Sequence, residues 1–164
     1  MHMEEWRKNL KKRPTRTWSR VEIEEIIKEN HIDRARFAEY SKTEYQAIIN
    51  RFYYAFVNYN STSTVKVQGA WNNIRHSLSK ADFISEDIGW YEMLDTMRRS
   101  LAMRCDAKCF LLLEDGWLYE GYIEEVNKVL REIDGFIEAF YIFTYDFDFL
   151  YVYSSDARGY VLYN

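Results

Sequence analysis

The stretch FYIFTYDFDFLYVYSSD at residues 140–156 decides how this sequence can fold. Eight of its seventeen residues are Phe or Tyr, and three are Asp. Successive side chains of a strand point to opposite faces. Residues 140–145 and 149–154 would each be apolar or aromatic on both faces, which is typical of central strands covered on both sides. The stretch therefore predicts a buried hairpin with an acidic turn at Tyr145–Asp148.

The segment before this hairpin predicts two more strands and a helix. Residues 108–114 form a nearly continuous apolar run, and Asp115-Gly116 is a tight hairpin signal followed by a return strand at 117–121. Apolar residues at helical spacing predict a helix over 123–133. A fifth short strand is expected at 159–163.

The N-terminal hundred residues are dominated by helical periodicity. Two capping boxes, at 19–22 and 41–44, predict helix starts. The first helix should end near Asn30, and the second carries an apolar stripe at i, i+3, i+4 and i+7 spacing. A third helix is expected over 85–101, and a short strand at 65–67.

These patterns together predict an α+β protein. N-terminal helices would pack with a C-terminal, mostly antiparallel sheet in the order β-β-α-β-β, carrying one inserted helix. We expect a basic arm at 1–18 and a single domain at 19–164, with its helical part at 19–103 and its sheet part at 104–164.

Composition and motifs indicate the cellular compartment in which the protein is expected. Residues 1–20 contain no apolar run of the kind a signal peptide has, and no stretch approaches the length of a membrane span. Cys105 and Cys109 have a C-x3-C spacing, which fits neither a thioredoxin-like pair nor a standard zinc motif. We therefore expect a cytoplasmic protein with reduced thiols, no membrane contact and no cofactor.

Charge is distributed unevenly along the chain. Residues 106–164 hold 12 acidic residues against 4 basic ones, whereas residues 1–105 hold 14 against 18. Residues 7–20 carry seven bases and no acid. Such asymmetry concerns partners rather than fold. The basic arm could bind nucleic acid, with Trp6 and Trp18 as stacking residues. The net acidity of the chain instead favours an arm that is solvated or docked on the acidic C-terminal half of the same chain.

Signals for catalysis are sparse. Asp146 and Asp148 would share a face on a continuous strand and could hold a divalent cation, with Asp156 as a further ligand, as in a metal-dependent hydrolase or nuclease. The competing interpretation places both in a turn, where Asp accepts local backbone hydrogen bonds. His31 and His76 have no metal-ligand spacing, and no nucleophile or phosphate-binding motif is present.

The acidic C-terminal part also contains aromatic residues between its carboxylates. Aromatic anchors inside a charged rim are typical of protein-binding surfaces, and an acidic rim steers toward a basic partner. We therefore predict an acidic, aromatic partner-binding face formed by Trp117, Tyr119, Glu120, Tyr122, Glu124, Glu125, Asp146 and Asp148. The competing interpretation is a solvated acidic surface whose aromatic residues belong to the core.

The last 55 residues or so resemble a group of small uncharacterised bacterial proteins. The resemblance lies in Phe110–Gly116, Tyr119–Gly121 and Phe140–Phe143, followed by Phe147, Phe149 and Leu150. In that group a polar Asn-His-His-Asp element follows, where this chain has Tyr153–Asp156 and keeps only the Asp. Some relatives look like immunity proteins, which neutralise a toxin made by the same cell.

The resemblance and the acidic face together predict a non-enzymatic, cytoplasmic interaction protein of immunity or antitoxin type. It would occlude the basic active-site cleft of a partner such as a toxin domain. The metal-dependent hydrolase and the nucleic-acid-binding module remain the alternatives, and the sequence leaves the oligomeric state open, a dimer included.

Overall fold

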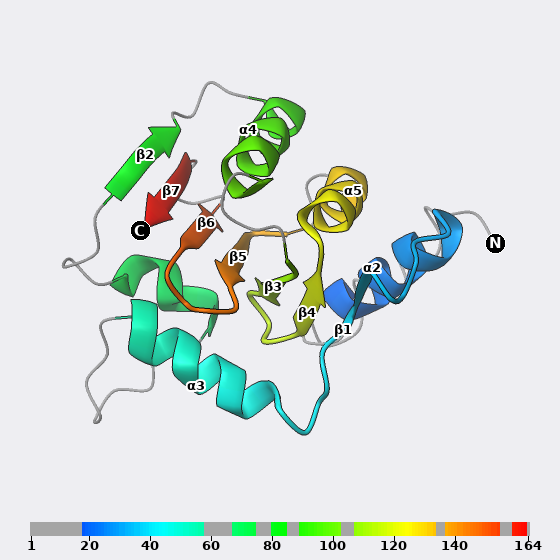
Figure 1. The fold of residues 1–164 in the computed structure, drawn as a ribbon, viewed down its shortest axis with the longest axis horizontal. Helices are drawn as coiled ribbons and strands as arrows, with labels where there is room; N and C mark the ends of the chain where they lie inside the picture. The colour runs from blue at the N-terminus through cyan, green and yellow to red at the C-terminus, as the bar shows by residue number, and fades with distance from the viewer. Residues whose placement is uncertain are drawn as a thin grey trace.

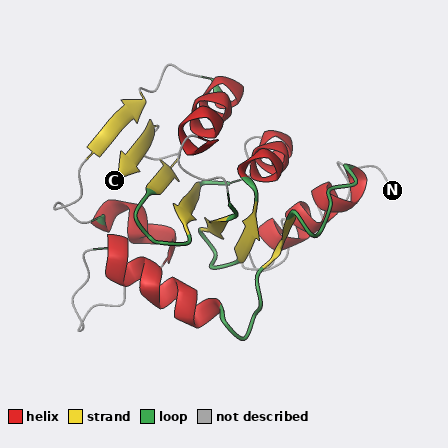
Figure 2. Cartoon of the chain, viewed as in Figure 1, coloured by secondary structure: helices red, strands yellow, loops and turns green. Residues whose placement is uncertain are grey.

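Seven antiparallel strands form one sheet in the computed structural model, which describes residues 18–57, 67–74, 80–84, 89–102, 107–133, 137–154 and 159–163 (Figure 1). The order across the sheet is β1-β4-β3-β5-β6-β7-β2. The strands are β1 Phe37–Glu39, β2 Lys80–Ile84, β3 Cys109–Leu113, β4 Leu118–Gly121, β5 Ala139–Thr144, β6 Leu150–Ser154 and β7 Gly159–Tyr163. The helices are α2 Trp18–Glu29, α3 Tyr45–Phe56, α4 Trp90–Ala102, α5 Ile123–Ile133 and the 3-10 helix η2 Val67–Asn73. The predicted α+β class is confirmed (Figure 2).

The aromatic hairpin lies in the middle of this sheet, as its two apolar faces predicted. Strands β5 and β6 pair in antiparallel register from Ala139 opposite Ser154 to Phe143 opposite Leu150. Every residue of β5 is buried, because β3 and β6 flank it and helices cover both of its faces.

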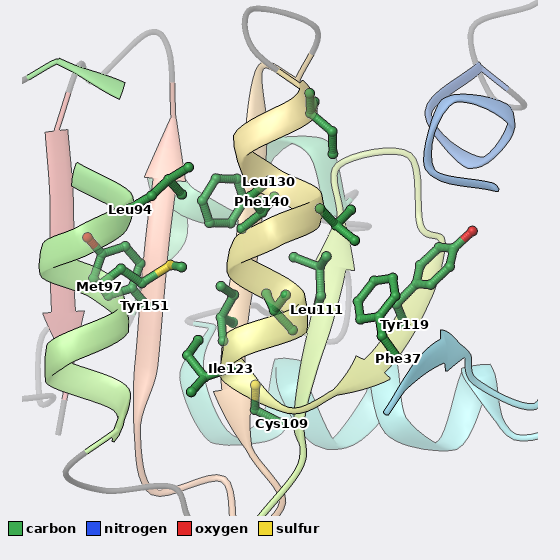
Figure 3. Close-up of a cluster of buried hydrophobic side chains, with 14 of the residues drawn as sticks. Phe37, Leu94, Met97, Cys109, Leu111, Tyr119, Ile123, Leu130, Phe140 and Tyr151 are labelled. Carbon is green, nitrogen blue, oxygen red and sulfur yellow. The ribbon is translucent and has the colours of Figure 1, made fainter. Parts of the chain in front are cut away.

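Alternate residues of β5 divide between two apolar clusters, one on each face of the sheet. Phe140 and Ile142 pack with residues of α2, α4 and α5, and part of this cluster is drawn in Figure 3. Tyr141 and Phe143 face the other way and pack against α3 and η2. Figure 1 shows α3 on one side of the sheet and α4 and α5 on the other. The second apolar face is therefore covered by helices of the same chain.

Two strands of the sheet come from the N-terminal hundred residues, where local sequence patterns predicted mainly helices. Strand β1 adds to the edge beside β4, and β2 adds beside β7. The short strand predicted at 65–67 is wrong at Val67, which begins η2, and residues 65 and 66 lie outside the described residues. Helix α4 begins at Trp90, and residues 85–88 also lie outside them.

Neither predicted N-cap serine lies at the start of its helix. Helix α2 includes Trp18, so Ser19 lies inside its first turn and donates its hydroxyl hydrogen bond to Asp115 in the β3–β4 turn. Helix α3 has Glu44 at its N-cap with no side-chain cap, and the Ser41 hydroxyl pairs with that of Thr43 instead. Longer-range and neighbouring polar partners compete for these hydroxyl groups.

Strand β1 approaches the sheet closely because Gly121 has no side chain. A Cβ atom at Gly121 would lie 2.6 Å from the Phe37 ring and 2.7 Å from the Arg36 carbonyl oxygen. Glycine is the residue that permits such close backbone approach. No helix in the described part of the chain is long and apolar enough to cross a membrane.

Candidate interaction surface

The structure separates the eight predicted partner-binding residues instead of gathering them on one face. Trp117 lies at the end of the sheet that carries the β3–β4 turn, where its ring contacts Tyr45 edge-on at 6.4 Å. Arg20 and Lys42 lie over the same ring, at 5.3 and 5.4 Å from its centroid. Trp117 is therefore largely engaged within its own chain, far along the sheet from the β5–β6 turn.

Two of the predicted residues are buried. Tyr119 has no exposed surface; its ring stacks on Phe37 at 5.2 Å, and its hydroxyl donates to Glu24. Burial and the nearby Glu24 carboxylate raise the pKa of Tyr119. Glu125 is 7% exposed and accepts two hydrogen bonds from Arg36, at 2.7 and 3.2 Å. Because both faces of the sheet are covered, alternation along β4 could not place Tyr119 on the surface.

Two more of the predicted residues have partners within the chain. The Arg36 guanidinium lies 4.3 Å from the centroid of the Tyr122 ring, and Lys108 lies 5.9 Å from it. Glu124 pairs with Arg98 across α5 and α4 at 3.3 Å. The acidic start of α5 is thus partly neutralised by bases that come earlier in the sequence.

The remaining three predicted residues, Glu120, Asp146 and Asp148, lie at the same end of the sheet, around a cluster of aromatic rings. Phe110 in β3 forms the buried base of this cluster. Tyr145 stacks on it with ring centroids 4.6 Å apart, and Tyr40 contacts it edge-on at 5.4 Å. Phe147 completes the cluster, 6.1 Å from Phe110 and 5.3 Å from Phe143.

The turn that presents these rings has an unusual backbone. Phe147 has a φ of 56°, in the left-handed region that glycine and asparagine normally occupy. Its amide donates to the Thr144 carbonyl at 3.1 Å, and the Thr144 hydroxyl donates to Asp148. Burial of the Phe147 ring against Phe143 and Phe56 offsets the backbone strain. The turn therefore holds an aromatic side chain where a small residue would be the usual choice.

This arrangement fits the turn interpretation of the two aspartates. Both lie between β5 and β6, and both are exposed. Within the described residues, no group of three or more His, Cys, Asp or Glu side chains is placed to hold a metal ion. Asp156, the third ligand of the hydrolase alternative, lies outside them, as do His76 and residues 1–17 of the basic arm.

We call this surface the Tyr145 patch, formed by Tyr40, Glu44, Glu120, Tyr145, Asp146, Phe147 and Asp148. Tyr145 is 39% exposed, and its hydroxyl donates a hydrogen bond to Glu120. Burial, followed by this hydrogen bond, raises the pKa of Tyr145, and burial also raises the pKa of Tyr40. Both tyrosines therefore stay neutral at physiological pH, and the patch carries its charge on four carboxylates.

The patch combines predicted residues with others that the sequence did not single out. Tyr145 and Phe147 lie in the aromatic stretch itself, where the two aspartates drew attention first. Tyr40 and Glu44 come from the segment between β1 and α3, and no local pattern connects them with the hairpin. The guanidinium group of Arg51, in α3, lies 4.2 Å from the centroid of the Phe147 ring. Among the described residues, it is the basic group that contacts a ring of the patch. Chemically, the arrangement can bind a cation or a basic surface.

The chain belongs to the family of unknown function DUF6756, whose model matches residues 15–164. No curated protein and no solved structure matches the chain.

Proposed function

We propose that this member of the family is a cytoplasmic protein-interaction module of immunity or antitoxin type, which uses the Tyr145 patch to occlude a basic partner protein. Binding, rather than catalysis, is the activity. The partner presents a basic cleft, and the patch covers it.

One observation carries this proposal: partly exposed aromatic rings are fixed on a buried base and surrounded by carboxylates. Phe110 is 4% exposed, whereas Tyr145 above it is 39% exposed. Tyrosines held in one position contribute contact area at low entropic cost, and hot spots at protein interfaces are enriched in them. The four carboxylates of the patch would speed association with a basic surface.

The backbone conformation of the β5–β6 turn supports the same proposal. Residues in sparsely populated backbone regions persist only where the surrounding structure stabilises them, and they are enriched at functional sites. Phe147 is held in this way, and its ring lies 6.1 Å from Phe110, the ring on which Tyr145 stacks. The patch is thus preorganised, which reduces the entropy lost on binding.

Site-specific photo-crosslinking tests the proposal in cells that express the chain. A benzophenone amino acid replaces Tyr145 in one variant and Tyr54 in a control variant. Tyr54 is a good control because it is 75% exposed on α3 and lies outside the patch. We expect a basic protein to be crosslinked from position 145 and not from position 54, and less of it when Asp146 and Asp148 are both replaced by Lys.

The crosslinked protein is then purified and assayed with the chain. We expect the wild-type chain to block its toxic or enzymatic activity, and the Asp146→Lys, Asp148→Lys double variant to lose that ability. Identical adducts from positions 145 and 54, or a partner that stays fully active at saturating chain, would contradict the proposal.

A further inference from the structure

The chain holds three of its arginines in the same kind of site, between one aromatic ring and one carboxylate. Arg36 lies 4.3 Å from the centroid of the Tyr122 ring and 2.7 Å from Glu125. Cation–π attraction and a charge-assisted hydrogen bond act on the same guanidinium group, and its planar shape suits both.

The other two sites repeat this arrangement in different parts of the fold. Arg20 lies over Trp117 at 5.3 Å and bonds Glu39 at 2.9 Å. Arg131 lies over Tyr91 at 4.9 Å and bonds Asp95 at 2.8 Å. Each site thus pairs one ring face with one carboxylate around a single arginine.

The Tyr145 patch contains the same pair of groups without the arginine. Tyr145 is 39% exposed and stacks one face of its ring on Phe110, so the opposite face is the one that a ligand could contact. Glu120 lies at the hydroxyl end of this ring and accepts the Tyr145 hydrogen bond through one oxygen. Within the described residues, no arginine or lysine lies over the Tyr145 ring or pairs with Glu120.

Two lysines lie over the same rings as two of these arginines, but within the described residues only the arginines also pair with a carboxylate. Lys42 and Lys108 lie over Trp117 and Tyr122 at 5.4 and 5.9 Å, and neither forms an ion pair with a described carboxylate. An ammonium group is compact and strongly hydrated, and it cannot stack on a ring while it forms two parallel hydrogen bonds.

We propose that the exposed face of Tyr145 and the carboxylate of Glu120 form a binding subsite for one arginine side chain of the partner protein. Glu44, beside Tyr40, adds negative charge next to this subsite. The inference rests on the proposed function for the source of the arginine, but the binding chemistry belongs to this chain alone and can be measured without the partner.

The experiment is a nuclear magnetic resonance titration of the full chain, with the tyrosine rings isotope-labelled. The probes are N-acetyl-arginine methylamide, the matching lysine derivative, and the matching citrulline derivative, which has nearly the same shape as arginine without its charge. We expect the arginine derivative to shift the Tyr145 ring resonances in a saturable way, the lysine derivative to bind more weakly, and the citrulline derivative to leave them unchanged.

Two controls connect the signal to the subsite. The Tyr91 ring should stay unperturbed, because it already carries Arg131. Glu120→Gln should weaken arginine binding roughly tenfold, the usual scale for losing one charge-assisted hydrogen bond, whereas Glu132→Gln, at an exposed site on α5, should not change it.

Equal shifts with citrulline and arginine, or undiminished binding by Glu120→Gln, would overturn the inference. Failure of the crosslinking experiment with a normal titration would instead remove the proposed function and leave the arginine subsite in place.

Discussion

Replacing Glu114 by Gln should stabilise the protein above pH 7 and leave its stability nearly unchanged near pH 4. Glu114 follows β3 and begins the turn to β4. Its Oε1 accepts the Glu138 amide at 3.2 Å, whereas its buried Oε2 accepts no hydrogen bond among the described residues. Burial, and then the like charges of Glu138 and Asp115, raise the pKa of Glu114 to about 7.

The sign follows from the number of protons that each state binds. In the unfolded chain the carboxyl group has its ordinary pKa of 4.5, so between about pH 4.5 and 7 the folded state binds more protons than the unfolded state. The contribution of Glu114 to stability is therefore complete below pH 4.5 and is lost as the pH rises through 7. A glutamine imitates the protonated form and does not titrate.

The magnitude follows from the same difference in pKa. At about 1.4 kcal/mol per pH unit, a fully buried carboxyl group would lower the free energy of unfolding by roughly 3 kcal/mol between pH 4.5 and pH 7. Because the Glu114 side chain is only half-buried, solvent screening reduces the expected loss to about 1 to 2 kcal/mol.

Urea unfolding at a series of pH values from 4 to 8 measures this difference between wild type and Glu114→Gln. The free energies of unfolding should agree near pH 4 and diverge steadily, with the variant about 1 to 2 kcal/mol more stable at pH 8. Glu132→Gln serves as a control, and its effect should be small at every pH. A difference that is constant with pH, or a variant that is less stable at pH 8, would refute the reasoning.

Three further predictions concern the stability of the fold. Gly121→Ala should cost about 3 kcal/mol, since its Cβ would meet the Phe37 ring at 2.6 Å and the Arg36 carbonyl oxygen at 2.7 Å; thermal unfolding measures this loss. Phe52→Ala should cost about 3 to 5 kcal/mol in urea unfolding because the ring is fully buried, whereas Tyr54→Ala on the same helix should change stability by less than about 0.5 kcal/mol. Arg36→Met should lower the melting temperature far more than Arg98→Met. The first substitution leaves the buried Glu125 carboxylate without its arginine, whereas the second leaves the exposed Glu124 carboxylate.

The sequence predicts the parts of this fold that depend on local periodicity. The central hairpin follows from the apolar residues on both faces of 140–154, and α5 follows from its amphipathic spacing. Strand β1 is three residues long and has no alternating pattern, so its pairing with β4 depends on the long-range approach that Gly121 permits. A local pattern cannot specify such a contact.

The candidate site was predictable only where it shares residues with the hairpin. Charge alone points to Asp146, Asp148 and Glu120. The same sequence pattern also places Tyr119 and Glu125 on this surface, although both are buried. Acidic residues at neighbouring positions of a helix or strand point in different directions, and the sequence does not show which of them meets an arginine of the same chain. That information comes from tertiary packing.

The charge asymmetry along the chain acquires a different meaning once these internal pairs are known. Bases of the N-terminal part pair with acids of the C-terminal part, as Arg36 does with Glu125, and Arg131 pairs in the opposite direction with Asp95. An acidic residue that is already paired with an arginine contributes little to the long-range electrostatic field of the protein. Replacing such a residue by a basic one would therefore change stability rather than partner recognition. The carboxylates around Tyr145 form no such ion pair within the described residues, so charge reversal at Asp146 is where an effect on partner binding should appear without a loss of folding.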